Sequence, residues 1–168
     1  RIADASELPV IADADTGYGN PINTRRTIRD YEKAGVAGVH LEDQAWPKRC
    51  GHMRGKKPIP IEEHVQNIRA AVDSRRDRDF FIVARTDARQ VHGLQEAIRR
   101  CKAYKKAGAD ALFIEAPQSR RELAQIAREL EPPLVANMLE GGVTPLQPRD
   151  ELNELGFHLV VYPLTCLY

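Results

Sequence analysis

A cluster of chemically capable side chains lies between residues 42 and 52, directly after a short apolar run. In order along the chain, this segment contains Glu42, Asp43, Lys48, Arg49, Cys50, Gly51 and His52. Carboxylates bind hard metal ions, and a thiol near positive charge is a usable proton donor or nucleophile. Because both occur at the end of one predicted strand, the segment indicates metal-assisted chemistry on a small acid, and therefore an enzyme.

A second pair of acids, Asp13 and Asp15, ends an earlier apolar run. Strand side chains repeat every two residues, so these two carboxylates share one side of the backbone. With Glu42 from the next strand they could hold Mg²⁺, or Mn²⁺, through direct or water-mediated contacts, since Mg²⁺ takes few carboxylates and keeps several waters. Alone, the Asp-x-Asp pattern would more simply cap the following helix. The neighbouring Glu42 favours the metal interpretation.

Two other interpretations of the cysteine segment fail on spacing. The Cys-x-His pattern at Cys50 does not match structural zinc sites, and no second cysteine pair exists. Residues 51–56 are one residue short of a phosphate-binding loop, and Lys57 stands where serine or threonine is needed. So polar a segment is expected to be an exposed loop, in which Gly51 allows the backbone to approach a ligand closely.

Further polar groups follow the later strands. Arg85 ends a strand that should be buried on both faces, so it needs an anionic partner. That partner is either a substrate carboxylate or Glu115 at the end of the next strand. Asn137, and Thr144 in the turn at residues 140–145, offer amide and hydroxyl groups on the same rim.

No chemical role is expected for the remaining histidines and cysteines. Histidines within strand patterns are more often packed in the core, which applies to His40 and His158. His64 and His92 belong to no cluster of candidate site residues and are expected to face solvent. Core positions are expected for Cys101 and Cys166.

The elements that must position these groups alternate between strand and helix. Strands are expected at residues 10–13, 38–42, 80–85, 111–115, 134–137 and 158–162. Helices are expected at residues 24–34, 61–74, 94–107, 119–130 and 149–155. Glycines at predicted helix ends and Ser119 as a helix cap support these boundaries. Apolar strands that alternate with helices indicate a parallel sheet covered by helices.

The polar groups end five successive strands, which favours a (β/α)₈ barrel. In such barrels the strand ends meet on one face, which carries the active site. A doubly wound open sheet would gather ligand residues at one switch point, and no Gly-x-Gly-x-x-Gly follows a strand here. A weak repeat between residues 31–42 and 104–115 agrees with a barrel, although a generic helix–glycine–strand pattern would also explain it. We predict an incomplete TIM barrel of about six βα units, with residues 1–168 as one partial catalytic domain.

Composition excludes several other classes of protein. The 168 residues carry a net charge of +1, and the 29% charged residues form no basic block, so no nucleic-acid partner is expected. No apolar run is close to the length of about 20 residues that a helix needs to span a bilayer. Three distant cysteines indicate reduced thiols in a cytoplasmic protein. The chain begins without methionine and stops inside an apolar run, so we expect it to be a piece of a longer protein.

The motifs above resemble those of the isocitrate lyase / phosphoenolpyruvate mutase superfamily in order and spacing. They are DADTGYG at 13–19, EDQ at 42–44, KRCGH at 48–52, ARTDA at 84–88 and ANM at 136–138. The resemblance implies a Mg²⁺-dependent (β/α)₈ barrel, usually a homotetramer whose last helix swaps between subunits. The family's first two strands, which carry a substrate loop and another metal-linked Asp, and its C-terminal helices have no counterpart in this sequence.

The resemblance also implies roles for individual residues. Asp13, Asp15 and Glu42 would surround the metal and its waters. Cys50 would be the catalytic acid, with Lys48 ordering its loop and His52 beside it in the catalytic segment. The expected contacts to a small carboxylate substrate come from Arg85, Glu115, Asn137, Gly51, Thr144 and Pro163.

The Lys-Arg-Cys-Gly-His form resembles the carbon–carbon lyases of the superfamily, namely 2-methylisocitrate lyase and the 2-alkylmalate lyases. Such enzymes cleave a 2-hydroxy di- or tricarboxylate to a 2-oxo acid and a carboxylic acid, whereas phosphoenolpyruvate mutases typically lack the cysteine. Two alternatives stay open. One is oxaloacetate hydrolase or carboxyphosphonoenolpyruvate/phosphoenolpyruvate mutase chemistry on the same metal site, and the other is an inactive barrel that serves as an assembly module.

Overall fold

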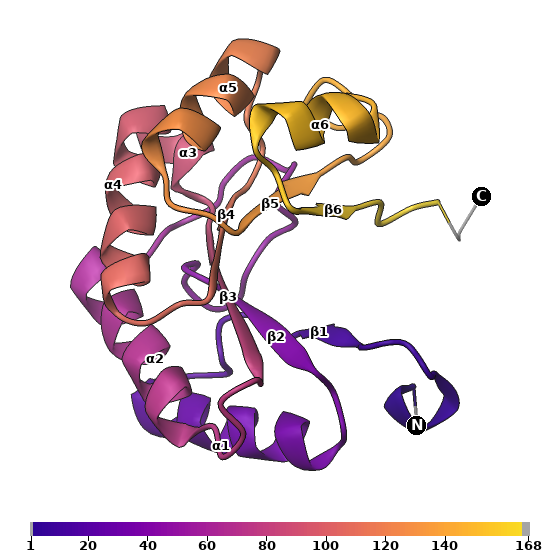
Figure 1. Ribbon diagram of the computed structural model, residues 1–168. Helices are drawn as coiled ribbons and strands as arrows, with labels where there is room; N and C mark the ends of the chain where they lie inside the picture. Colours follow the sequence, from indigo (N-terminus) through magenta and orange to yellow (C-terminus); the bar gives the residue numbers. More distant parts are fainter. Residues whose placement is uncertain (1, 166–168) are drawn as a thin grey trace.

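The computed structural model describes residues 2–165 and contains one six-stranded sheet. The strands lie in sequence order, and each pairs in parallel with the next. They are β1 (Ile11–Asp13), β2 (Gly38–Glu42), β3 (Phe81–Thr86), β4 (Ala111–Ile114), β5 (Leu134–Asn137) and β6 (Leu159–Val161). Figure 1 shows the sheet curled, with β1 and β6 at its two edges.

The helices lie on the outer side of the curled sheet (Figure 1). They are α1 (Pro21–Lys33), α2 (Ile61–Ser74), α3 (Ala88–His92), α4 (Leu94–Lys106), α5 (Arg120–Glu129) and α6 (Arg149–Leu155), preceded by a short 3₁₀ helix at Ala3–Ala5. Sequential parallel strands with helices on one side confirm the predicted incomplete barrel and exclude the doubly wound alternative. None of the helices within residues 2–165 has the length and apolar character needed to cross a bilayer.

Most boundaries agree with the sequence, and the differences have local causes. The first helix starts at Pro21 rather than at residue 24, because Asn20 accepts hydrogen bonds from the amides of Ile22 and Asn23 in a capping box. Proline suits this position, since its missing N–H would have no partner in the first turn. The five-residue helix α3 was not predicted, because it is too short to show a helical period.

The core has two layers, one on each face of the sheet. A large cluster between sheet and helices includes Leu41, Ile82 and Leu112. A smaller cluster on the inner face consists of Val83, Ala111, Phe113 and Val135, with Phe81 and Leu159 packed against it. Because side chains alternate along each strand, both faces are apolar, as the continuous apolar strand segments predict.

His158 and His64, both expected to play no chemical role, are placed differently from the expectation, and His40 is a third such residue, which lies in the site described below. His158 was expected in the core but is exposed, because β6 begins only at the next residue. His64 was expected to face solvent but is fully buried, with its ring 4.7 Å from that of Tyr104. His64 lies on α2 three residues after Ile61 and four before Ile68, so it shares their inward stripe. Cys101 is buried as expected, and Cys166 lies outside the described residues.

Burial of His64 gives the protein a defined sensitivity to acid. Burial lowers the pKa of His64 from 6.5 to about 4, while the nearby charges of Asp43 and Arg100 act in opposite directions. As pH falls through this window, the unfolded chain binds a proton that the folded chain excludes, so stability is lost on acidification. Between pH 7 and 4, the free energy of unfolding measured in urea should fall by about 3 kcal/mol less in a His64→Leu variant than in the wild type.

The exposed His92 provides the matched control for this prediction. A His92→Leu variant should lose stability on acidification in parallel with the wild type. Equal pH slopes for the wild type and His64→Leu would contradict the prediction.

Candidate active site

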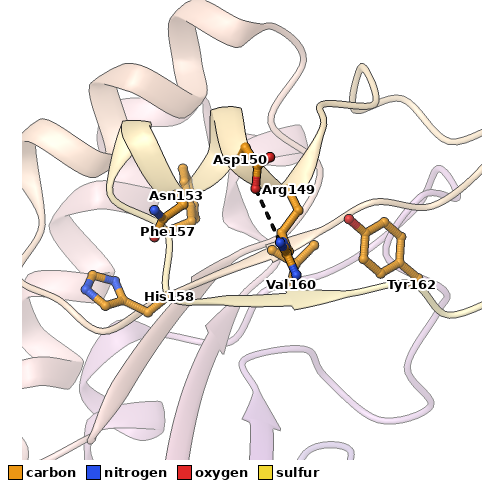
Figure 2. Close-up of a pocket in the computed structure, with 7 residues that line it drawn as sticks. All are labelled: Arg149, Asp150, Asn153, Phe157, His158, Val160 and Tyr162. Atoms are coloured by element: carbon orange, nitrogen blue, oxygen red, sulfur yellow. Dashed lines mark hydrogen bonds and ion pairs between the residues drawn. The ribbon is translucent and has the colours of Figure 1, made fainter.

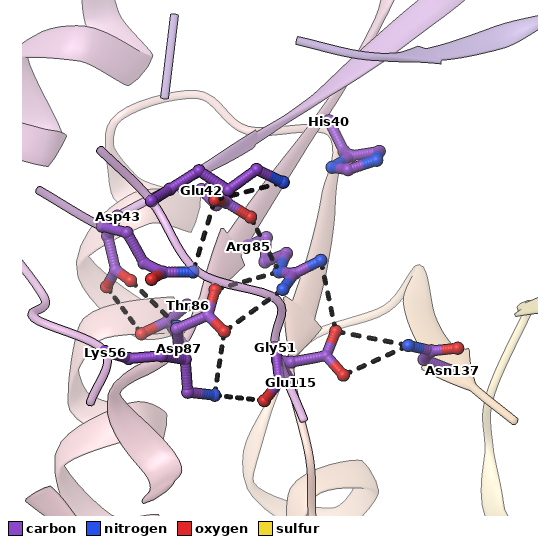
Figure 3. A network of polar contacts seen from close by, with 12 residues as sticks. His40, Glu42, Asp43, Gly51, Lys56, Arg85, Thr86, Asp87, Glu115 and Asn137 are labelled. Atoms are coloured by element: carbon purple, nitrogen blue, oxygen red, sulfur yellow. Dashed lines mark hydrogen bonds and ion pairs between the residues drawn. The ribbon is translucent and has the colours of Figure 1, made fainter. Parts of the chain in front are cut away.

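Polar side chains from successive strands meet at the carboxyl edge of the sheet (Figure 3). Glu42 at the end of β2 pairs in register with Arg85 of β3, which places both side chains at the same level. Glu115 follows β4, and Asn137 ends β5. A cavity of about 470 Å³ opens on the inner face of the sheet, and its lining includes Asp13, His40, Arg85, Phe113, Asn137 and Pro163.

The three predicted metal ligands gather around one ammonium group. Lys48 Nζ is 2.7 Å from Asp15 Oδ1, 3.7 Å from Glu42 Oε1 and 4.0 Å from Asp13 Oδ2. Asp15 has a positive φ of 47°, an unusual conformation for a residue with a side chain. Its amide donates to Asp13 Oδ1, and its carbonyl accepts from the amide of Glu42. Backbone contacts therefore hold the two strand ends together.

The electrostatics of this cluster favour the gain of positive charge. Burial raises the pKa of Glu42 to about 7, although Arg85 opposes the shift. Partial burial acts to lower the pKa of Lys48, but its hydrogen bond to Asp15 and the charges of Glu42 and Asp13 raise it overall. Both shifts mean that these two groups hold their protons more strongly than they would in water.

The side chains present fit a hard divalent cation. Asp13, Asp15 and Glu42 present carboxylate oxygens to one position, and Glu42 Oε2 is buried without a hydrogen-bond partner among residues 2–165. Such oxygens, completed by water, are what Mg²⁺ takes in proteins. Within the described residues no three histidine, cysteine or acidic side chains already converge as a ligand set. Lys48 stands between these carboxylates, so a divalent cation requires its ammonium to move.

Arg85 is the centre of a second group of charges. Its Nε lies 3.0 Å from Asp87 Oδ2 and 3.4 Å from Glu42 Oε2, and its NH1 lies 3.3 Å from Glu115 Oε2. Phe113 packs under the guanidinium at 5.3 Å. Burial alone would lower the pKa of Arg85, but the charges of Glu115 and Asp87 raise it above its ordinary value. The sequence allowed a substrate or Glu115 as partner, and the structure supplies Glu115 together with two further carboxylates.

Glu115 is an ionised carboxylate held by three side chains. His52 Nε2 is 2.7 Å from Glu115 Oε1, and the Asn137 amide donates to the same oxygen at 3.1 Å. Burial acts to raise the pKa of Glu115, but the hydrogen bond from His52 and the charge of Arg85 hold it at about 2. Asn137 Oδ1 is buried without a partner among the described residues. A ligand in the cavity can therefore donate to this oxygen.

His52 joins three separate segments. Its Nδ1 accepts a hydrogen bond from the amide of Val143 at 3.1 Å, so in the neutral ring the proton is on Nε2 and is donated to Glu115. A Cβ at Gly142 would lie 2.7 Å from His52 Nδ1, which explains glycine at that position of the turn. The expectation that His52 is catalytic stays a prediction, because both of its ring nitrogens are engaged in holding the loop.

The predicted cysteine lies beside this group. Cys50 is exposed, as expected for a polar loop. The adjacent Gly51 is buried so closely against Glu115 and Arg85 that a Cβ there would overlap both side chains. The backbone next to Cys50 therefore packs onto the charged cluster, which any larger residue at position 51 would prevent.

The remaining predicted site residues differ in their placement. Pro163 lines the interior cavity together with Arg85 and Asn137. Thr144 is buried, and its hydroxyl has no hydrogen-bond partner within residues 2–165, whereas the neighbouring Val143 contacts His52. His40 was expected in the packed core but is only half-buried and lines the cavity, 3.6 Å from Asp13 Oδ1.

Several residues of the network were not assigned a role from the sequence. Asp43 and Asp87 were recognised only as acids at strand ends, and Gln44 only as part of a motif. Lys56 was considered only within the failed phosphate-loop pattern. Each of them lies at a strand end or within the cysteine loop, and this position is the signal that could have identified them. Gln44 contacts Arg49, five residues away, whereas Asp43, Asp87 and Lys56 contact partners that are distant in the chain.

A second cavity of about 420 Å³ lies between α6 and β6 (Figure 2). Its lining consists of Arg149, Asp150, Asn153, Phe157, His158, Val160 and Tyr162, none of which belongs to the charged network. The chemistry is therefore assigned to the interior of the sheet.

Comparison with known proteins shows what the chain is similar to. Residues 1–167 match the family model described as phosphoenolpyruvate phosphomutase. The chain is 56% identical to the chloroplastic carboxyvinyl-carboxyphosphonate phosphorylmutase of Arabidopsis thaliana and 52% identical to the 2,3-dimethylmalate lyase of Eubacterium barkeri. Both alignments cover 99% of this chain but only 50% and 58% of the relatives. The chain thus spans about half the length of the curated relatives it matches.

Solved structures show the same relationship. A crystal structure of 2,3-dimethylmalate lyase superposes with a TM-score of 0.95 at 44% identity, covering 99% of this chain and 56% of that one. Oxaloacetate acetylhydrolase with the inhibitor 3,3-difluorooxalacetate gives a TM-score of 0.94 at 42% identity, covering 99% of this chain and 57% of that one. Phosphonopyruvate hydrolase, solved with oxalate and Mg²⁺, superposes with a TM-score of 0.80 at 32% identity, covering 96% of this chain and 56% of that one.

Proposed function

Because the chain belongs to the phosphoenolpyruvate phosphomutase family, we propose that the full-length protein is a divalent-metal-dependent carbon–carbon lyase. Its substrate is a 2-hydroxy di- or tricarboxylate of the methylisocitrate or 2-alkylmalate type, and its products are a 2-oxo acid and a carboxylic acid. The preferred ion is Mg²⁺, with Mn²⁺ as a substitute.

One observation carries the proposal. An acidic cluster built for a cation and a group that can bind carboxylate lie on the same edge of the sheet, and the loop with the exposed Cys50 lies between them. Gly51 packs on Arg85 and Glu115, while Lys48 of the same loop contacts Asp15. A loop that touches both groups can present a proton donor to a molecule bound by both.

Asp13, Asp15 and Glu42 would hold the divalent ion, with water in the remaining positions. When bound, the ion supplies electron withdrawal from the 2-oxygen of the substrate as the carbon–carbon bond breaks. Arg85 binds substrate carboxylate through the part of its guanidinium that faces the cavity, and Asn137 accepts a hydrogen bond through its free Oδ1. These contacts fix the orientation of the cleaved bond.

Cys50 supplies the proton that completes the cleavage. As the bond breaks, its electron pair moves to the departing carbon, giving an enediolate-like carbanion, and the thiol of Cys50 protonates it as general acid. The substrate hydroxyl releases one proton to solvent, the departing carbon takes one from Cys50, and solvent returns one to the thiolate, so the reaction consumes neither water nor an oxidant. Exposure of Cys50 to solvent allows its thiolate to be reprotonated.

The names of the relatives raise the alternative of hydrolase or mutase chemistry on the same site. A thiol acid can protonate a carbanion but has no place in a phosphoryl rearrangement, so Cys50 favours carbon–carbon cleavage over the mutase chemistry. The other alternative, an inactive assembly module, needs no ordered charged network, and burial of Glu42, Arg85 and Glu115 favours an enzyme.

An assay of the full-length protein on four substrates tests the proposal. We expect cleavage of 2-methylisocitrate or 2,3-dimethylmalate, loss of that activity after treatment with a chelator, and its return with Mg²⁺ or Mn²⁺. Turnover of oxaloacetate or phosphonopyruvate alone would replace the lyase by the hydrolase or mutase alternative. No turnover and no Mg²⁺ binding in calorimetry would favour the assembly module.

A further inference from the structure

The loop that carries Cys50 is closed at its base by backbone contacts. Gln44 and Pro58 form an isolated antiparallel bridge, and the amide of Ala45 donates to the carbonyl of Lys57 at 2.7 Å. The amide of Ile59 donates to the carbonyl of Asp43 at 2.8 Å. These contacts fix where the loop starts and ends but not where its tip lies.

Two buried side chains hold the tip, one on each side of Cys50. Before it, the Gln44 side chain accepts from the amide of Arg49 at 3.1 Å and donates to the Arg49 carbonyl at 2.8 Å. After it, the ammonium of Lys56 donates to the carbonyl of Gly51. Cys50 is therefore an exposed residue between two anchored peptides.

Lys56 is an unusual residue for an anchor. Its ammonium is fully buried, and an unpaired buried charge is costly. Asp87 supplies the compensating charge, with Oδ1 3.0 Å from Lys56 Nζ. The neighbouring Lys57, by contrast, is exposed. The sequence therefore places two lysines side by side, of which one enters the charged network (Figure 3).

The partner of Lys56 also holds the residue that binds substrate in the proposed function. Asp87 Oδ2 accepts from Arg85 Nε at 3.0 Å, and its Oδ1 accepts from Arg85 NH2 at 3.2 Å. One carboxylate thus fixes the guanidinium of Arg85 on one side and the ammonium of Lys56 on the other. The position of the Cys50 loop is coupled through this carboxylate to the orientation of Arg85.

We infer that Lys56 is a positioning residue that sets the place of Cys50 relative to Arg85. This inference rests on the proposed function for its effect on turnover, although the anchoring itself does not depend on the reaction. Lys56 contacts no reacting atom. It keeps the proton donor and the carboxylate-binding group at a fixed separation, which is the condition for efficient proton transfer to a bound substrate.

The test compares Lys56→Met with Lys57→Met in the full-length protein. Lys56→Met should lower kcat by about 10- to 100-fold. It should change KM by less than about threefold, because Arg85 keeps its contacts to Asp87 and Glu115. Lys57→Met should behave as the wild type. Lys56→Arg should recover part of the lost kcat, since it restores a charged donor for the Asp87 carboxylate and the Gly51 carbonyl. If Lys56 only filled space, Lys56→Met would retain the wild-type kcat.

Hydrogen exchange supplies a readout that does not depend on activity. In Lys56→Met the amides of residues 49–53 should exchange faster, while those of α4 keep their wild-type protection. If Lys56→Met does not fold, Lys56→Gln serves in its place, because its amide can still donate to the Gly51 carbonyl without a charge.

The outcomes separate failure of this inference from failure of the proposed function. Wild-type kcat in the folded Lys56 variants, or unchanged exchange at residues 49–53, overturns the positioning role. If the wild-type protein cleaves none of the four substrates, the proposed function fails. Hydrogen exchange alone then decides whether Lys56 anchors the loop. Faster exchange confined to 49–53 in Lys56→Met and absent in Lys57→Met then still supports the anchor.

Discussion

Replacing Cys50 by alanine is expected to lower kcat of the full-length protein by about a thousandfold, within the range that general acid catalysis contributes. The thiol is exposed, and the adjacent Gly51 packs on Arg85 and Glu115 of the charged network. Because Cys50 is exposed, its truncation leaves no buried cavity, and stability should change little. Steady-state kinetics on the substrate that the wild type cleaves gives the measurement.

The retention of metal binding makes this result specific. Cys50 is not among the side chains that surround Lys48, so Mg²⁺ titrated by calorimetry should bind Cys50→Ala as it binds the wild type. Met53, which is 60% exposed on the same loop, provides the control, and Met53→Ala should keep its turnover. A Cys50→Ala protein with wild-type kcat would remove the thiol from the mechanism.

The strand ends of the site follow from the sequence because parallel strands impose a common edge. Once the apolar segments are recognised as sequential parallel strands, Asp13, Glu42, Arg85 and Asn137 must face the same side. The structure confirms this, and the register of Glu42 with Arg85 makes their proximity a consequence of strand pairing. Sequence reasoning succeeds here because the period of the strand fixes the direction of the side chain.

The partners of these residues do not follow from the sequence. Lys48 was expected to order its loop, but the sequence cannot show that its ammonium stands among the three carboxylates. Lys56 lies in a polar segment that predicts exposure, yet it is fully buried because a carboxylate thirty-one residues away compensates its charge. Contacts of this kind depend on how a loop folds back, for which the sequence has no periodic signal.

The helices present the same contrast. The stripe of α2 that includes Ile61 and Ile68 could have placed His64 in the core, but His64 was expected to face solvent because it belongs to no cluster of site residues in the sequence. Asp43 presents the clearest case, because it follows a conspicuous glutamate and yet serves a different purpose. Its side chain is fully buried on the helix side of the sheet, where it contacts α4.

Asp43 is the acceptor at the centre of a buried network. Its carboxylate accepts from Thr86 Oγ1 at 2.6 Å, from the amide of Asp87 at 2.9 Å, from Arg100 NH1 at 2.9 Å and from Tyr104 Oη at 2.8 Å. Arg100 is itself only 5% exposed. Removal of the carboxylate therefore takes away the buried one of the two counter-charges of Arg100, leaving Glu96 at 2.9 Å from its Nε, and it leaves three polar groups without this acceptor.

An Asp43→Ala variant should lose about 3–5 kcal/mol of stability, the cost of breaking a buried ion pair from one side. Urea denaturation of the full-length protein measures the loss. The control is Asp30→Ala, whose side chain is 67% exposed and pairs at 3.6 Å with the still more exposed Arg26, so its stability should change by less than about 1 kcal/mol.

The same variant should also damage the site, because Asp43 fixes the backbone of Asp87, which in turn holds both Arg85 and Lys56. Asp43→Asn keeps an acceptor oxygen without the charge, so it should fall between the wild type and Asp43→Ala in both stability and kcat. A loss of less than about 1 kcal/mol in Asp43→Ala would contradict the prediction and would mean that Glu96, which already pairs with Arg100 at 2.9 Å, compensates its charge alone.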